Sequence, residues 1–165
     1  MGSDLATAFA PVAGPDTRVL ILGSLPGAAS LRAAQYYAHP RNAFWPLLGG
    51  ILGRDLVSMD YPDRIAALGA ARVGLWDVIA EARRRGSLDA AIRSPRPAAL
   101  SDLVARLPAL RAIGFNGATA ARLGRRELAG IDSVALIDLP SSSPAHTLDI
   151  TAKRAAWSVL ARHLA

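Results

Sequence analysis

The chain has no cysteine among its 165 residues. This absence excludes disulfide bonds, thiol catalysis and a cysteine-ligated iron–sulfur cluster. Its three histidines, His39, His146 and His163, are widely spaced. Without cysteine partners they make a poor zinc site. We therefore expect a protein that needs neither a metal ion nor another cofactor.

Long hydrophobic runs are also missing. No apolar run approaches the roughly 20 residues that a membrane-spanning helix needs, and the N-terminus lacks a basic region followed by an apolar core. We therefore expect no membrane span, no export signal and a cytoplasmic location. The apolar fraction of 52% and charged fraction of 19% are typical of a globular protein. We expect one domain over residues 17–165, preceded by a loosely ordered leader at 1–16.

The positive charge comes almost entirely from arginine. The formal net charge is +6, and Lys153 is the only lysine among 19 basic residues. Arginine pairs with phosphate groups through two parallel hydrogen bonds, so this balance suits a polyanionic partner. A generally basic proteome is an equally good explanation of the charge taken alone.

Four apolar segments with the character of buried strands alternate with helical segments. The strands are expected at 18–22, 71–75, 111–115 and 134–139, and the main helices at 42–52, 62–68, 101–107 and from 151 onward. Between them, we expect a basic turn at 83–86, a short helix at 87–92 and a break at 94–97. This alternation predicts an α/β fold with three layers, α/β/α, around a central four-stranded parallel sheet.

The ends of these strands carry the polar and glycine-rich or proline-rich residues. The segments concerned are 23–27, 74–77, 115–117 and 139–146. Because parallel strands end at one edge of their sheet, these segments are expected to meet there and to form a site. The segment 36–42 adds two tyrosines, a histidine, an arginine and an asparagine. Such side chains suit a flat, polar, hydrogen-bonding ligand such as a nucleobase.

Five short segments together resemble the uracil-DNA glycosylase superfamily, specifically its hypoxanthine-DNA (deoxyinosine) glycosylase branch. They are Gly-Ser-Leu-Pro-Gly at 23–27, Tyr-Tyr-Ala-His-Pro-Arg-Asn-Ala-Phe-Trp at 36–45, Gly-Leu-Trp-Asp-Val-Ile at 74–79, Phe-Asn-Gly at 115–117 and Leu-Pro-Ser-Ser-Ser-Pro-Ala at 139–145. The chain departs from the related thymine-DNA glycosylases at two positions. Ser24 stands where they have a catalytic asparagine, and Asp77 where they have a base-reading asparagine.

The resemblance implies a DNA glycosylase that hydrolyses the N-glycosidic bond of deaminated bases in base-excision repair, with hypoxanthine as the first candidate substrate and uracil as the second. It implies a monomer acting on double-stranded DNA, with single-stranded DNA as a further candidate. A monofunctional enzyme is expected, because a lyase needs an amine nucleophile and Lys153 sits in the C-terminal helix. The alternatives are a glycosylase for uracil or G:T/U mismatches, a nucleotide-binding α/β domain, and a DNA-binding module without catalysis.

The catalytic candidates are Asn42, Asp77 and Asn116. By resemblance, Asn42 positions the water or sugar; its place in the sequence taken alone favours a cap of the following helix. A carboxylate at Asp77 could accept from N1–H of hypoxanthine or act as a general base, or it could cap a helix beginning near residue 78. Asn116 resembles a functional asparagine of the family, and Asn-Gly is also a common turn dipeptide.

The remaining candidates contact the base or the DNA backbone. The base-binding candidates are Ser24, Leu25, Tyr36, Tyr37 and Phe44, of which at least one tyrosine is expected in the core and Phe44 is more often a helix-core residue. The DNA-binding candidates are His39, Arg41, Ser141, Ser142, Ser143 and His146. The serines resemble a loop that enters the minor groove; an ordinary Ser/Pro turn is the alternative.

Overall fold

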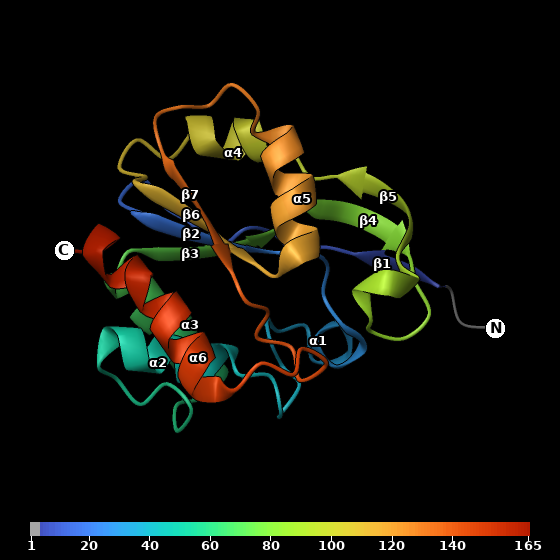
Figure 1. Cartoon of the computed structure of the whole chain (residues 1–165), viewed down its shortest axis with the longest axis horizontal. Helices are drawn as coiled ribbons and strands as arrows, with labels where there is room; N and C mark the ends of the chain where they lie inside the picture. Colours follow the sequence, from blue (N-terminus) through green and yellow to red (C-terminus); the bar gives the residue numbers. More distant parts are fainter. Residues whose placement is uncertain (1–3) are drawn as a thin grey trace.

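The computed structural model describes residues 4–165, and a four-stranded parallel sheet forms its centre (Figure 1). The strand order is β3-β2-β6-β7, and all neighbours run parallel. The strands are β2 (Val19–Gly23), β3 (Val73–Asp77), β6 (Ala112–Asn116) and β7 (Ala135–Leu139). The predicted fold class and the four predicted strands are confirmed.

Helices cover both faces of this sheet (Figure 1). On one face lie α4 (Leu100–Ala105) and α5 (Ala118–Glu127), and on the other α2 (Phe44–Leu52), α3 (Tyr61–Ala70) and α6 (Ile150–Trp157). A 3-10 helix, η2 (Ser158–His163), continues α6, and the short α1 (Ala28–Ala33) follows the loop after β2. The protein therefore has the three layers that the alternation of elements predicts.

The central strand β2 is buried on both sides, which explains its unbroken apolar sequence. Because side chains alternate along a strand, Leu20 and Leu22 pack in the cluster beneath α4 and α5. Val19 and Ile21 pack in the opposite cluster. That second cluster also contains Trp157 of α6.

A second, three-stranded antiparallel sheet was not predicted. Its order is β1-β4-β5, from β1 (Leu5–Thr7), β4 (Ile79–Arg83) and β5 (Arg93–Pro97), with a 3-10 turn η1 (Asp89–Ala91) between β4 and β5. The expected break at 94–97 is wrong: β5 forms despite its prolines because an edge strand tolerates missing N–H groups. The expected short helix at 87–92 is reduced to η1.

The N-terminal stretch is more firmly attached than we expected. Leu5–Thr7 pairs with β4, and Val12 pairs with Leu75. Residues 1–3 of the expected leader lie outside the described part of the chain. Within the described residues, no helix is both long and apolar enough to cross a membrane.

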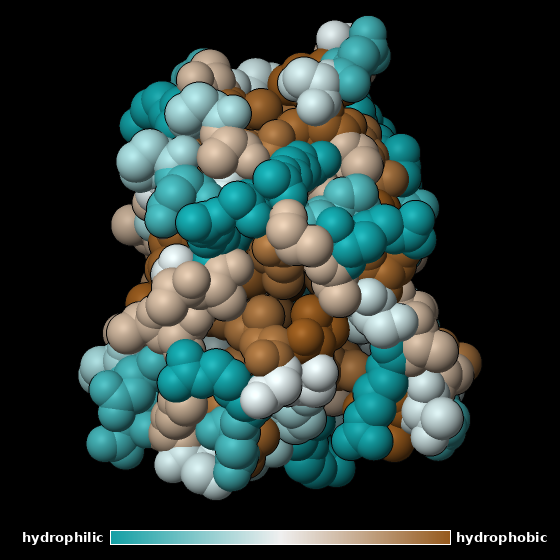
Figure 2. Space-filling view, turned by 90° about the vertical axis from the view of Figure 1, so that its left-hand side faces the viewer, coloured by the Kyte–Doolittle hydropathy of each residue, from teal (hydrophilic) through white to brown (hydrophobic). Residues whose placement is uncertain are grey.

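The face where the strands begin lies on the left of Figure 1, beside the C-terminus. Figure 2 shows this face, where a central apolar area is bordered by hydrophilic side chains. Arg18 donates from Nη1 to the carbonyl of Leu164 over 3.1 Å, and Arg111 donates to the carbonyl of Ala165. These contacts fix the end of the chain on the sheet, away from the edge where the strands end.

Candidate active site

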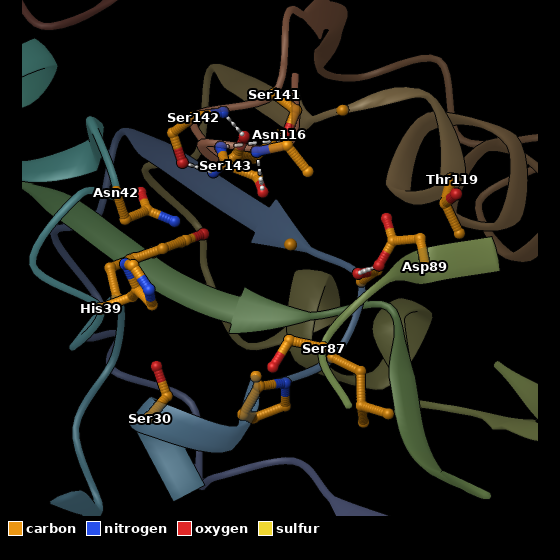
Figure 3. Close-up of a pocket in the computed structure, with 18 of the residues that line it drawn as sticks. Ser30, His39, Asn42, Ser87, Asp89, Asn116, Thr119, Ser141, Ser142 and Ser143 are labelled. Atoms are coloured by element: carbon orange, nitrogen blue, oxygen red, sulfur yellow. Dashed lines mark hydrogen bonds between the residues drawn. The ribbon is translucent and has the colours of Figure 1, made fainter. Parts of the chain in front are cut away.

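A pocket of about 510 Å³ lies at the C-terminal edge of the parallel sheet (Figure 3). The ends of β2, β3 and β6 contribute to it, together with the segment before α2 and the loop after β7. The predicted convergence of these segments is confirmed. The predicted site residues that line the pocket are Ser24, Leu25, Tyr36, Tyr37, His39, Asn42, Asp77, Asn116, Ser141, Ser142, Ser143 and His146.

Two predicted site residues do not line the pocket. Phe44 is fully buried, and its ring stacks behind that of Tyr37 with centroids 3.8 Å apart and planes inclined by 13°. The predicted contact of Phe44 with a base is wrong, because its apolar ring is at the centre of the aromatic cluster under the pocket. Phe44 instead supports the ring of Tyr37. Arg41 is exposed next to the pocket residues His39 and Asn42. Its contact with DNA stays a prediction.

Asn42 faces the pocket and lies one residue before Ala43, the N-cap of α2, so the predicted cap position is wrong by one residue. Its Oδ1 accepts the N–H of Phe44 at 2.9 Å, at the start of α2. Since this bond fixes which end of the amide is the oxygen, Nδ2 is the end directed into the pocket (Figure 3). The second lone pair of Oδ1 is not used by this bond. The side chain can therefore bond the first N–H of α2 and also contact a ligand or a water.

Asp77 is a buried carboxylic acid at the end of β3, with 5% of the residue exposed. Burial raises its pKa from 3.8 to about 7; Arg84 opposes the rise and Asp89 adds to it. Its Oδ2 has no hydrogen-bond partner among the described residues. The alternative of a helix cap is wrong, because strand β4 begins two residues later. An unpartnered buried oxygen facing a pocket is suited to a polar ligand.

The hydroxyl of Tyr37 lies close to Asp77, with Gly23 between the two. A Cβ on Gly23 would lie 2.7 Å from Oδ1 of Asp77 and 3.2 Å from the Tyr37 hydroxyl, so only glycine fits there. The Tyr37 hydroxyl is also buried and has no partner of good hydrogen-bond geometry in the described structure. Burial raises the Tyr37 pKa, with a further rise from Asp77, while the neighbouring Asn116 amide opposes it.

Tyr36 has a structural role, which confirms that one tyrosine belongs to the core. It is 5% exposed, and its hydroxyl donates to the carbonyl of Ala10 at 2.9 Å. Its ring meets that of Phe9 edge to face. Burial raises the pKa of Tyr36, and the charges of Asp77 and Tyr37 add to the rise. Its hydroxyl is therefore held neutral and occupied at the wall of the pocket.

Asn116 holds the serine loop, residues 141–143 after β7, in place. Its Nδ2 donates to Oγ of Ser142 at 2.9 Å, and its Oδ1 accepts the Ser142 N–H at 2.8 Å. Both residues are buried. The next residue, Gly117, has φ of +102°, and a Cβ there would lie 3.2 Å from Cβ of Ser141. Asn116 therefore precedes the predicted turn and fixes the loop after β7, and its catalytic role stays a prediction.

The serine loop is tied to the rest of the site by its backbone. The carbonyl of Ser142 accepts the N–H of Ala43 at 2.9 Å, which joins this loop to the Asn42 segment. Lys153 donates from Nζ to the carbonyls of His146 at 2.9 Å and Ser143 at 3.4 Å. Burial lowers the Lys153 pKa. His146 itself is exposed at the rim.

Sequence reasoning missed a polar network on the opposite wall. Oγ of Ser24 donates to Oδ1 of Asp89 at 2.6 Å, and Nη1 of Arg84 lies 3.9 Å from the same oxygen. The Arg84 side chain is only 1% exposed and donates to the carbonyl of Pro26. The sequence run Arg83 to Arg85 indicates a solvated turn. Alternation along β4, had that strand been recognised, would have placed Arg84 on the buried side with Ala82.

The described residues contain no group of three or more histidine, aspartate or glutamate side chains placed to hold a metal ion. The pocket lining supplies two carboxyls, of which that of Asp77 has a raised pKa, two amides, two phenols, two imidazoles and several hydroxyls. These groups can hydrogen-bond a base and hold a water molecule.

Comparison with models of protein families supports the interpretation of this pocket as an active site. The model of the uracil DNA glycosylase superfamily matches residues 10–161, nearly the whole chain. The chain belongs to this superfamily. The superfamily assignment and the enzyme class that the sequence motifs predicted, a DNA glycosylase, are thereby confirmed.

Two curated relatives and one solved structure resemble this glycosylase closely. A hypoxanthine DNA glycosylase of Methanosarcina barkeri is 46% identical over 109 residues, 66% of this chain and 69% of the relative. A hypoxanthine DNA glycosylase of Methanosarcina acetivorans is 38% identical over 157 residues, 94% of this chain and 97% of the relative. A solution NMR structure from M. acetivorans, described as a candidate uracil DNA glycosylase, has 37% identity and a TM-score of 0.87, covering 97% and 98% of the two chains.

Proposed function

We propose that this glycosylase removes hypoxanthine from double-stranded DNA as a monomer, by hydrolysis and without lyase activity. The observation that carries the proposal is the unpartnered Oδ2 of buried Asp77 in the pocket. The two curated relatives, 46% and 38% identical, bear the name hypoxanthine DNA glycosylase. The target nucleotide must leave the base stack to reach this pocket, because a duplex buries the bond to be broken.

Asp77 is the proposed reader of the base. Hypoxanthine carries an N1–H donor, which an ionised carboxylate accepts. With a pKa of about 7, Asp77 is ionised in about half of the molecules at pH 7 and in most molecules above it. The Tyr37 hydroxyl beside it offers a donor to a carbonyl oxygen of the same base. The rate of excision is therefore expected to rise with pH through about 7 and then to level off.

Asn42 is proposed to act at the sugar. Breaking the N-glycosidic bond places positive charge on the sugar and negative charge on the departing base, and a water molecule must attack the anomeric carbon. The free lone pair of Oδ1 can accept from that water, and Nδ2 can donate to the sugar or the base. The hydrogen bond to Phe44 holds the amide in this orientation before the substrate arrives.

The lack of lyase activity follows from the position of the only lysine. Lys153 is 4% exposed and its ammonium group is used by two backbone carbonyls. It does not line the pocket. No other lysine is present to attack the sugar. The products are expected to be the free base and an intact strand with an abasic site.

The experiment is product analysis after reaction with duplexes that contain one hypoxanthine or one uracil. Free base is measured by chromatography, and strand cleavage is measured with and without alkali. We expect release of hypoxanthine, with strand cleavage only after alkali. Strand cleavage without alkali would show lyase activity and contradict a purely hydrolytic enzyme. A faster release of uracil than of hypoxanthine would make uracil the main substrate.

A further inference from the structure

The loop between β4 and β5, residues 84–92, forms one wall of the pocket but belongs to none of the sequence motifs. Ser87, Leu88 and Asp89 line the pocket from this loop. Figure 3 shows Asp89 across the pocket from Asn42 and His39. A base that occupies the pocket therefore lies beside this loop.

The inner side of the β4–β5 loop is fixed to the motif at 23–27. Asp89 accepts from Ser24 at 2.6 Å, and Oγ of Ser87 accepts the N–H of Ala28 at 2.9 Å. Arg84 is turned inward, where it bonds to the carbonyl of Pro26. These bonds restrict the loop before DNA binds, and such restriction lowers the entropic cost of a contact.

The outer side of the loop combines an apolar side chain with positive charge. Leu88 is 59% exposed, more than the other exposed large hydrophobic side chains of the described residues. Residues 83–93 contain four arginines and one aspartate, a net charge of 4 − 1 = +3. Arg84 is buried and lies 3.9 Å from the exposed Asp89, so the exposed arginines are Arg83, Arg85 and Arg93. Arg85 forms an ion pair of 3.4 Å with Asp4 at the surface, where it is open to exchange for a phosphate.

An exposed leucine among arginines fits a partner that presents both phosphates and apolar base faces. We propose that the β4–β5 loop contacts the duplex beside the flipped nucleotide. Leu88 packs against the base stack at the gap, and Arg83 and Arg85 bind neighbouring phosphates. This inference rests on the proposed function, and it adds a second DNA-contacting element to the serine loop at 141–143.

The first test is Leu88→Ala, with Val57→Ala as the matched control. Val57 is also exposed, by 52%, but does not line the pocket. Hypoxanthine release is measured under single-turnover conditions on duplex and on single-stranded DNA. We expect Leu88→Ala to slow release from the duplex about tenfold, because the buried contact of one leucine is lost, and to leave single-stranded DNA unaffected. Leu88→Phe and Val57→Ala are expected to keep the duplex rate.

Two results would overturn this role of Leu88. One is an unchanged duplex rate in Leu88→Ala, and the other is an equal loss on duplex and single-stranded DNA. Fluorescence of a 2-aminopurine next to the hypoxanthine adds a readout that does not need base release. The wild-type protein is expected to raise it on binding, and Leu88→Ala to raise it less.

The second test is the salt dependence of duplex binding. Arg83→Ala and Arg85→Ala are each expected to lower the slope of log affinity against log salt by about one, whereas Arg106→Ala, on the exposed end of α4, leaves it unchanged. Unchanged slopes in both Arg83→Ala and Arg85→Ala would refute the phosphate contacts. An equal reduction of the slope in Arg106→Ala would show that the effect is not specific to Arg83 and Arg85. If the wild-type protein released no hypoxanthine, the proposed function would fail, while the slopes and the fluorescence would still decide the role of the loop.

Discussion

Replacing Asp77 by asparagine is expected to remove a large pH dependence from the stability of the fold. The folded protein keeps the Asp77 proton up to about pH 7, whereas an unperturbed carboxyl loses it near 3.8. Between these values the folded state binds more protons than the unfolded state, so the free energy of unfolding falls as the pH rises. The loss levels off above pH 7. At 1.36 kcal/mol per pKa unit, a shift of about three units gives about 4 kcal/mol.

The assay is urea unfolding of the wild-type protein and Asp77→Asn at several values between about pH 4 and pH 8. Asparagine has nearly the same shape and carries no charge, so the variant avoids burying a carboxylate. The stability of the variant relative to wild type should therefore rise across this range by about 4 kcal/mol. Its excision rate should lose the rise through pH 7. Parallel stability curves for the two proteins would refute the burial of an ionisable Asp77.

Three further substitutions test the site. Asn116→Ala leaves the buried N–H and hydroxyl of Ser142 without partners, and should lower the free energy of unfolding by about 1–3 kcal/mol in urea titrations. Tyr37→Phe removes a buried hydroxyl that has no partner, so the free energy of unfolding should not fall in the same titrations. Single-turnover excision should become slower in this variant. An unchanged excision rate would show that Tyr37 takes no part in base recognition. Lys153→Met removes the donor to the carbonyl of His146, and should increase amide hydrogen exchange of the serine loop; unchanged exchange would contradict its holding role.

The parallel sheet could be predicted because its strands are continuous apolar runs. A strand such as Val19–Gly23, buried on both faces, leaves a strong local signal. The antiparallel sheet leaves no such signal in the sequence, because β5 is exposed throughout and contains two prolines. Its formation depends on pairing with β4, whose residues also pair with Leu5–Thr7. Such distant pairing cannot be found from local periodicity.

The site could be predicted from strand ends and motifs, but its electrostatics could not. Parallel strands end at one edge, and this rule placed Asp77 and Asn116 together, whereas Asn42 was found from its motif. The raised pKa of Asp77 needs its burial, which depends on the packing of the whole fold. The inward direction of Arg84 is set by β4 and by the carbonyl of Pro26, neither of which is visible in the arginine run.

The central claim is that the pocket releases hypoxanthine from DNA with Asn42 at the reacting sugar. It is tested most directly by single-turnover cleavage of a duplex with one hypoxanthine, by the wild-type protein and Asn42→Ala. Asn42→Ala also removes the hydrogen bond to the first N–H of α2, so the fold of the variant must be checked by thermal unfolding. We predict release by the wild-type protein and a loss of about a hundredfold or more in the folded variant. Equal rates in the two proteins, or no release of hypoxanthine by the wild type, would contradict the claim.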